Sequence, residues 1–257
     1  MIALSTVLSI VKLFEMPYGG SITLASMLPI VILAYRHGAR TGLFAALVTS
    51  LIQMLLGLNN FSYFTSWISL VALAVFDYVL AFAVFGLAGV FREKIKNQST
   101  AMATGAALAS AVRYLCHVIS GATVWAGLSI PTEAALIYSV SYNATYMIPE
   151  SIILVLSCAY IGASLDFKRA VPVRRRSERT DAVASYLYIG AGFAALAGII
   201  VDTILVFSKL QNYENGEFMI YGLAQVNWIA VSVVTASLLA VAALLVLLAK
   251  RREAKTN

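Results

Sequence analysis

The sequence has 257 residues, of which 61% are hydrophobic and 12% are charged. A soluble domain is nearer half apolar and about a quarter charged, so this composition excludes an ordinary soluble protein. The formal net charge of +6 does not indicate nucleic-acid binding, because the basic residues lie between apolar blocks. We therefore expect an all-α integral membrane protein that contacts membrane lipid and has no nucleic-acid partner.

Eight apolar segments follow one another along the chain, and most have a length that crosses a hydrocarbon core of about 30 Å. They are 2–14, 22–35, 41–58, 68–91, 100–122, 136–163, 183–208 and 220–249. The first is shorter than the ~20 residues of a crossing, so we expect the sequence to begin inside a longer helix. The second is also short and is opened by PYGGSIT, which favours a re-entrant loop at its start.

The loops between these segments alternate in charge. YRHGAR, FREKIKN, DFKRAVPVRRRSER and the tail KRREAK hold most of the Lys and Arg residues. Because cytoplasmic loops carry the excess of Lys and Arg, we expect eight crossings with both termini inside (N-in and C-in). The strongest change in composition is a basic linker, 166–182, which separates a first domain, 1–165, from two further helices in 183–257.

Five ionisable residues lie within the apolar segments: Asp77, Arg113, His117, Glu150 and Asp202. Each costs roughly 2.5–3.5 kcal/mol at the centre of a membrane helix, so such groups normally face a partner or a cavity. Arg113 and His117 are four residues apart and share one helix face. Asp77 has two interpretations, a structural ion pair with Arg113 or the countercharge of a cationic ligand, and one carboxylate can serve both.

The segment ALIYSVSYNATYMIPESIILV carries two neighbouring polar stripes. Asn143, Tyr146 and Glu150 form one stripe at helical spacing, and Tyr138 and Tyr142 form the other. Such stripes either hold helices together through buried hydrogen bonds or line a pocket. The number of aromatic side chains favours the pocket.

Several further residues are expected near the outer helix ends at similar depth. Gly121 continues the face of His117, and Trp125 and Trp67 lie near the ends of their segments. A carboxylate such as Asp77 among aromatic rings suits a flat organic cation. The sequence contains no Walker A motif, no metal-ligand spacing and no nucleophile elbow. We therefore expect no enzyme, no catalytic residues, no metal and no cofactor.

Four motifs with compatible spacing carry a family resemblance over residues 1–165. They are PYGG…LPI, FDY..AF..FGLAG.FR, RYLCH..SG..VW and YSVSYN. With these motifs the sequence resembles the thiamine-specific S components (ThiT/YuaJ family) of energy-coupling factor (ECF) transporters. The resemblance implies a six-helix S-component-like bundle, here followed by two additional C-terminal transmembrane helices.

The resemblance also implies a function. It predicts a thiamine-binding subunit in the bacterial cell membrane that mediates thiamine uptake together with an ECF module, a transmembrane T component and two ABC-type ATPases. The implied ligand-binding residues are Asp77, Tyr78, His117, Gly121, Trp125, Tyr138, Asn143 and Trp67, with Arg113, Tyr146 and Glu150 in support. Trp125 would stack on the ligand, and Arg113 would orient Asp77 or pair with Glu150.

Three positions depart from the family pattern. Residue 77 is Asp where the family has Glu, which shortens the side chain by one methylene. Gly20 occupies the position at which the family has an aromatic residue that caps the ligand. We therefore expect this cap over the ligand to be weaker or to be supplied by Tyr18. Only the second half of a small-xxx-small docking motif is present, at Ala3, which indicates a truncated start or weaker docking to the T component.

Other functions remain open at this point. The chain could be a stand-alone proton-coupled carrier for thiamine or another vitamin, with Asp77, His117 and Glu150 as a relay, or an S component for a different vitamin. It could also be a structural or sensor membrane protein. For 183–257, with Asp202 inside a helix, we expect an added scaffold pair or a partner contact.

Overall fold

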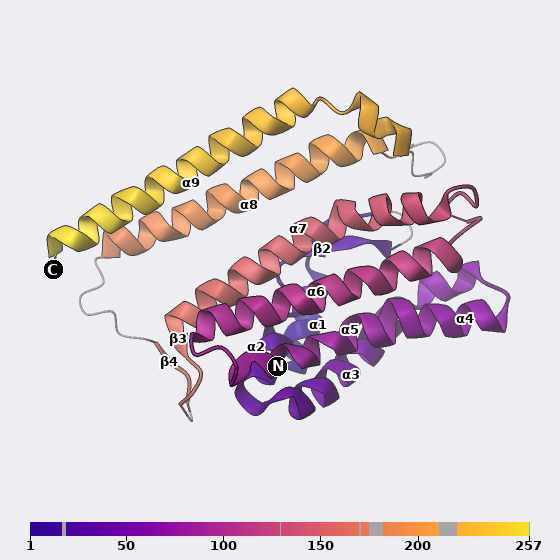
Figure 1. Cartoon of the computed structure of the whole chain (residues 1–257), viewed down its shortest axis with the longest axis horizontal. Coiled ribbons are helices and arrows are strands. Elements are labelled where there is room, and N and C mark those ends of the chain that lie inside the picture. Colours follow the sequence, from indigo (N-terminus) through magenta and orange to yellow (C-terminus); the bar gives the residue numbers. More distant parts are fainter. Residues whose placement is uncertain (17–18, 129, 170, 175–181, 211–219, 257) are drawn as a thin grey trace. The chain divides into compact units, whose positions relative to one another are not determined.

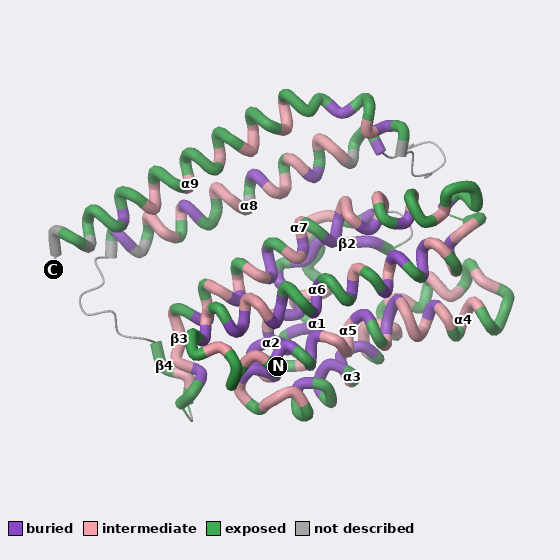
Figure 2. The backbone as a smooth tube through the Cα atoms, viewed as in Figure 1, coloured by how far each residue is buried: buried purple, intermediate pink, exposed green. Residues whose placement is uncertain are grey.

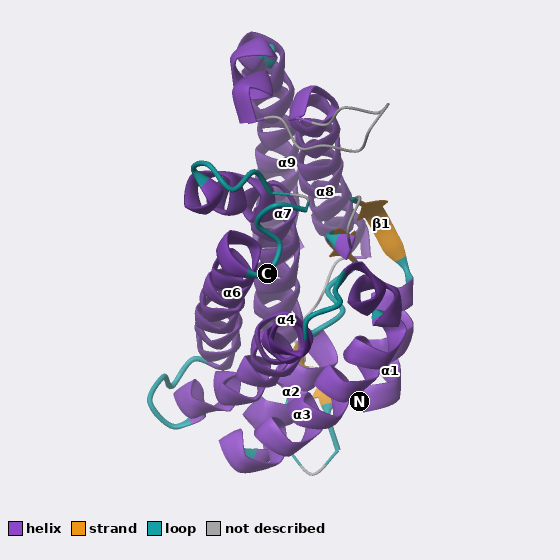
Figure 3. Cartoon of the chain, turned by 90° about the vertical axis from the view of Figure 1, so that its right-hand side faces the viewer, coloured by secondary structure: helices purple, strands orange, loops and turns teal. Residues whose placement is uncertain are grey.

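The computed structural model describes residues 1–16, 19–128, 130–169, 171–174, 182–210 and 220–256, and helices make up most of them (Figures 1 and 3). The chain divides into two compact units, and Met1–Val173 form the body of the first. The predicted fold class is confirmed, since the chain is an all-α membrane protein. Part of the predicted linker, 175–181, lies outside the described residues; next to it, β3 (Leu165–Asp166) pairs with β4 (Val173–Arg174).

Six of the described helical stretches are long and apolar enough to cross a membrane. They are Ala39–Leu56, Trp67–Arg92, Gln98–Thr123, Ala135–Ser164, Tyr186–Leu210 and Trp228–Arg252. The two remaining α-helices of the described residues, α1 (Ile2–Ile10) and α2 (Leu28–His37), are shorter. Ten residues extend a helix by only about 15 Å. Full-length crossing helices therefore account for six of the eight predicted segments.

The first two segments differ from the prediction in how they meet. The helix predicted over 2–14 ends at Ile10, and β1 (Lys12–Glu15) then pairs antiparallel with β2 (Ser21–Thr23). The chain reverses through Gly19, whose φ of +102° is in the region that favours glycine. The second segment therefore begins as a hairpin strand before α2, where a re-entrant loop was predicted.

Helix α2 is the buried centre of the first unit. Ile30, Val31 and Ala34 are fully buried, and Tyr35 is nearly so. Helix α3 (Ala39–Leu56) follows α2 directly after Gly38, whose φ is +87°. The long helices instead have exposed apolar residues, among them Phe44, Leu55 and Leu115. Exposed positions recur along these helices in Figure 2. This distribution matches a protein whose outer surface contacts lipid.

The stretch Trp67–Arg92 is helical throughout but changes its geometry. It consists of α4 (Trp67–Leu73), a π-helical turn η3 (Ala74–Leu80), α5 (Ala81–Ala83) and a 3-10 segment η4 (Val84–Arg92). In η4, Gly86 and Gly89 pack so closely on α3 and α2 that a Cβ atom at either position would overlap backbone atoms. The FGLAG motif is thus explained by helix packing. The π-helical turn, a rare geometry often found at functional sites, contains Asp77 and Tyr78.

Helices α6 (Gln98–Thr123) and α7 (Ala135–Ser164) pack side by side along their lengths (Figure 1). At one end the buried Gln98 donates to the carbonyl oxygens of Gly162 and Leu165, at 2.8 and 2.6 Å. The Asn97 side chain caps α6 by accepting from the backbone N–H of Thr100. Helix α7 continues through Pro149 as one unbroken helix.

The described part of the second unit consists of two long helices and a short 3-10 segment that precedes the second of them. It contains α8 (Ala182–Leu210), η5 (Ile220–Gln225) and α9 (Trp228–Thr256). Asp202 of α8 accepts a hydrogen bond from the Thr235 hydroxyl of α9 at 2.6 Å. The intramembrane carboxyl predicted at Asp202 therefore has an interhelical bond to Thr235.

Candidate functional site

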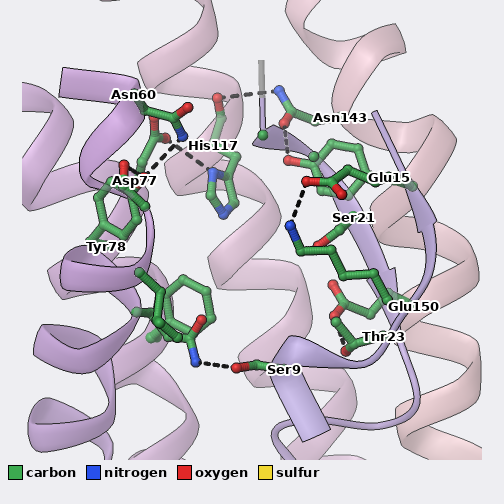
Figure 4. A pocket seen from close by; sticks show the side chains of 18 of the residues that line it. Ser9, Glu15, Ser21, Thr23, Asn60, Asp77, Tyr78, His117, Asn143 and Glu150 are labelled. Atoms are coloured by element: carbon green, nitrogen blue, oxygen red, sulfur yellow. Dashed lines mark hydrogen bonds and ion pairs between the residues drawn. The ribbon is translucent and has the colours of Figure 1, made fainter. Parts of the chain in front are cut away.

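A cavity of about 520 Å³ lies in the first unit, at the end where α6 finishes and α7 begins. Its volume is in the range of roughly 300–1,000 Å³ that is usual for small-molecule sites. Nine of the predicted residues line it: Asp77, Tyr78, Arg113, His117, Gly121, Trp125, Asn143, Tyr146 and Glu150. Figure 4 shows Asp77, Tyr78 and His117 on one side and Asn143, Glu150 and Thr23 on the other.

Asp77 is buried in the π-helical turn, and hydrogen bonds hold both of its carboxylate oxygens. Oδ1 lies 3.0 Å from Nδ1 of His117, and Oδ2 accepts from the indole N–H of Trp125 at 2.9 Å. The residue as a whole is only 9% exposed. The orientation of the carboxylate is therefore set by side chains from the last-but-one turn of α6 and from the loop that follows α6.

His117 connects Asp77 to the interior of the cavity. If Nδ1 carries the proton that is shared with the Asp77 carboxylate, Nε2 is a hydrogen-bond acceptor in the neutral ring. Nε2 is buried and has no hydrogen-bond partner within the described part of the chain. A buried polar atom of this kind normally finds a partner, so a ligand donor that reaches Nε2 would satisfy it.

The floor of the cavity is a buried ion pair. Arg113 Nη1 lies 3.0 Å from Oε2 of Glu150, and the Thr23 hydroxyl lies 2.7 Å from Oε1. The guanidinium group of Arg113 also lies over the Phe82 ring, 4.5 Å from its centroid. Arg113 was predicted either to orient Asp77 or to pair with Glu150, and in the structure it pairs with Glu150. The alternative ion pair between Arg113 and Asp77 is not formed.

Helix α7 supplies a wall of connected polar groups. The Tyr146 hydroxyl donates to Asn143 Oδ1 at 2.7 Å, and Asn143 Nδ2 donates to the Ser139 carbonyl at 2.9 Å. Tyr142 meets Tyr146 edge to face, with ring centroids 5.9 Å apart, and also lines the cavity. The two stripes predicted on this helix therefore both reach the cavity, the second through Tyr142.

Two predicted ligand contacts lie outside the cavity lining. Trp67 is the first residue of α4 and is 72% exposed. It precedes Asp77 by ten residues, which is about 15 Å along a helix. Tyr138 packs instead against an apolar cluster that includes Trp125 and Tyr78. The structure thus brings together the deeper members of the predicted set and leaves these two outside.

Other lining residues were not predicted from the sequence; they come from the hairpin, from the end of α3 and from the 3-10 helix η2 (Leu58–Tyr63). They include Lys12, Glu15, Ser21, Thr23, Gln53 and Asn60. Asn60 donates to the Tyr78 hydroxyl at 3.0 Å, which in turn donates to the Gly57 carbonyl at 3.1 Å. The two adjacent Asn residues in GLNNFSYFTS were the one feature of the local sequence that could have indicated polar lining residues here.

Gly20, the position of the missing capping aromatic, lines the cavity next to Tyr146. A Cβ atom at Gly20 would lie 2.9 Å from Tyr146 Cε1, so the Tyr146 ring occupies that space. Tyr18, the alternative lid residue, lies outside the described residues.

The charged groups of the cavity are mostly paired with one another. Lys12 pairs with Glu15 near the entrance, and Arg113 pairs with Glu150 at the floor. Among the described lining residues, Asp77 is the carboxylate that no Lys or Arg side chain pairs with. With a neutral His117 ring, the uncompensated negative charge of the cavity therefore lies at Asp77, which suits a cationic ligand.

Gly121 proves to be a packing residue as well as a lining residue. A Cβ atom there would overlap the hydroxyl of Ser139, which is fully buried and donates to the Val118 carbonyl at 2.8 Å. We expect Gly121→Ala to lower the free energy of unfolding by about 1–3 kcal/mol, the usual cost of overpacking. Thermal unfolding in detergent measures this change.

Two variants control for that result. Gly192→Ala adds the same methyl group in α8, where no atom lies within 4 Å of the new Cβ, and should not destabilise the protein. Adding Ser139→Ala to Gly121→Ala removes the overlapping hydroxyl and should restore part of the loss. Equal melting temperatures for Gly121→Ala and the wild-type protein would contradict the packing role.

Comparison with known proteins assigns the chain to a family. Residues 1–168 match the family described as thiamine transporter protein (Thia_YuaJ). A curated relative, the thiamine transporter ThiT of Bacillus subtilis (strain 168), is 34% identical over 164 residues, which cover 60% of this chain and 81% of the relative. The family match covers the part of the chain that contains the cavity. The chain belongs to the thiamine transporter protein family.

Proposed function

We propose that this protein is a membrane-embedded thiamine-binding subunit that mediates thiamine uptake. The observation that carries the proposal is the buried Asp77 carboxylate, which faces a small-molecule cavity without a Lys or Arg partner among the described lining residues. The thiazolium ring of thiamine has a permanent positive charge that it cannot lose by deprotonation. Family membership supports thiamine over other organic cations.

The remaining groups of the cavity suit the other parts of thiamine. Its aminopyrimidine ring offers N–H donors and ring-nitrogen acceptors. His117 Nε2 would accept from an N–H group that reaches it, and the Tyr146 and Asn143 side chains lie on the neighbouring wall formed by α7. Trp125 and Tyr142 supply aromatic surface, which favours flat rings and cations.

The ligand bound by the protein tests this proposal directly. Protein purified from thiamine-containing medium should release thiamine on denaturation, and mass spectrometry of the released fraction identifies it. A different vitamin in that fraction would favour the alternative of an S component for another substrate. No released compound after growth in saturating thiamine would count against the proposal.

We further propose that transport requires an ECF module, a T component with two ABC-type ATPases. The resemblance of residues 1–165 to S components supports this, as does the lack of a Walker A motif in the sequence. Uptake should then depend on ATP and on co-expression of the module. A stand-alone proton-coupled carrier would instead take up thiamine without the module and lose activity when the proton gradient is dissipated.

We also propose that the protein lies in the bacterial cell membrane with both termini inside. The charge of the loops supports this orientation. In a variant without Cys116 and Cys158, an impermeant maleimide should label Thr65→Cys in intact cells. It should label Lys94→Cys only after permeabilisation. Labelling of Lys94→Cys in intact cells would reverse the proposed orientation.

A further inference from the structure

The indole N–H of Trp125 is engaged within the protein. It donates to Asp77 Oδ2 at 2.9 Å, and the side chain is buried. An edge-to-face contact with Phe64, with centroids 5.1 Å apart at 80°, packs the indole. A role that is limited to stacking on a ligand uses the face of the ring and does not explain this bond.

The backbone around Trp125 holds the indole at a defined place. The backbone N–H of Trp125 donates to the Ser120 carbonyl at 3.2 Å. The backbone carbonyl of Trp125 accepts from the N–H groups of Leu128 and Ile130 at 3.1 and 3.3 Å. Gly127, with φ of +86°, allows the reversal between them. The loop after α6 is thus tied back on itself, and the direction of the indole N–H is set by this loop.

Asp77 needs such a donor because its carboxylate group turns easily. The terminal torsion of Asp is broad, so a single bond to one oxygen leaves the plane of the group poorly defined. His117 holds Oδ1, and Trp125 holds Oδ2. Two donors on different oxygens restrict the rotation and keep the negative charge toward the cavity.

We infer that Trp125 is a positioning residue that acts through Asp77, its indole N–H fixing the carboxylate that selects a cationic ligand. This inference rests on the proposed function, since thiamine is the cation used to test it. It separates two contributions of one side chain. The ring surface contributes to binding of any flat ligand, whereas the indole N–H holds the Asp77 carboxylate and so contributes only to binding of a cation.

The test replaces the N–H while it keeps the ring. Incorporation of benzothienylalanine at position 125 by codon suppression puts sulfur in place of the N–H group in a bicycle of similar shape. The affinities of wild type and variant are measured for thiamine and for its neutral thiophene analogue. We expect thiamine to bind roughly 10- to 100-fold more weakly, as for the loss of a hydrogen bond to a charged group, and the analogue to change much less.

The same replacement at Trp228 is the matched control, because its indole N–H donates to the Leu223 carbonyl at 3.1 Å in the second unit. This control should bind both ligands as the wild type does. Trp125→Phe provides a second variant without the N–H and should show the same selective loss of thiamine. Equal changes for the two ligands, or no change in either, would overturn the positioning role while thiamine binding by the wild type still supports the proposed function. A wild-type protein that binds no thiamine would overturn both.

Discussion

Replacement of Asp77 by Asn should weaken thiamine binding by roughly 30- to 1,000-fold, or about 2–4 kcal/mol. This is the range found when one charge of a buried, hydrogen-bonded pair is removed. Asn keeps the shape of the side chain but carries no charge. With the proton on Nδ1 of His117, the amide nitrogen of Asn also faces a donor on either His117 or Trp125, so one of the two present hydrogen bonds is lost.

The neutral thiophene analogue separates the charge from the geometry on the same variant. The lost hydrogen bond affects both ligands, whereas the lost charge affects only thiamine. Glu15→Gln is a matched control, because Glu15 lines the same cavity, is exposed and pairs with Lys12. It should change thiamine affinity by less than Asp77→Asn does. If Asp77→Asn weakened thiamine and the neutral analogue equally, Asp77 would have a structural role and no role as countercharge.

The second large effect concerns stability. Breaking the buried pair between Arg113 and Glu150 should lower the free energy of unfolding by about 3–5 kcal/mol, because the remaining charge is left buried without its partner. Arg113→Met preserves much of the apolar length of the side chain and is the variant of choice. Thermal and denaturant-induced unfolding in detergent measure the loss.

Two comparisons make this result specific to the pair. Combining Arg113→Met with Glu150→Gln removes both charges and should recover much of the stability. Lys12→Met breaks the exposed Lys12–Glu15 pair and should cost at most about 1 kcal/mol. A double variant that is less stable than Arg113→Met alone would show that the charges do not act as a pair.

The long helices were predictable because their apolar runs are local and continuous. The start of the chain was not, since KLFE and SIT form strands only through pairing with each other across a reversal. Apolar periodicity does not distinguish such short strands from the continuation of a helix. The π-helical turn at Ala74–Leu80 was equally beyond prediction, because its sequence is an ordinary apolar helical run.

The site was predictable where helical spacing defines a face, and less so where the partner comes from elsewhere in the chain. The spacing of Arg113 and His117 put both on one face, but it did not decide which carboxylate each would meet. The structure pairs Arg113 with Glu150 and His117 with Asp77. Thr23 reaches Glu150 over a long sequence separation, so no local pattern pointed to it.

Equilibrium titration of purified, ligand-free protein with thiamine is the most direct test of the account. Trp125 lines the cavity, so thiamine should change the tryptophan fluorescence saturably, and calorimetry should give one bound thiamine per protein molecule. Asp77→Asn, titrated in parallel, should bind far more weakly. Absence of saturable thiamine binding by a folded wild-type protein, in both measurements, would contradict the proposal that this cavity is a thiamine site.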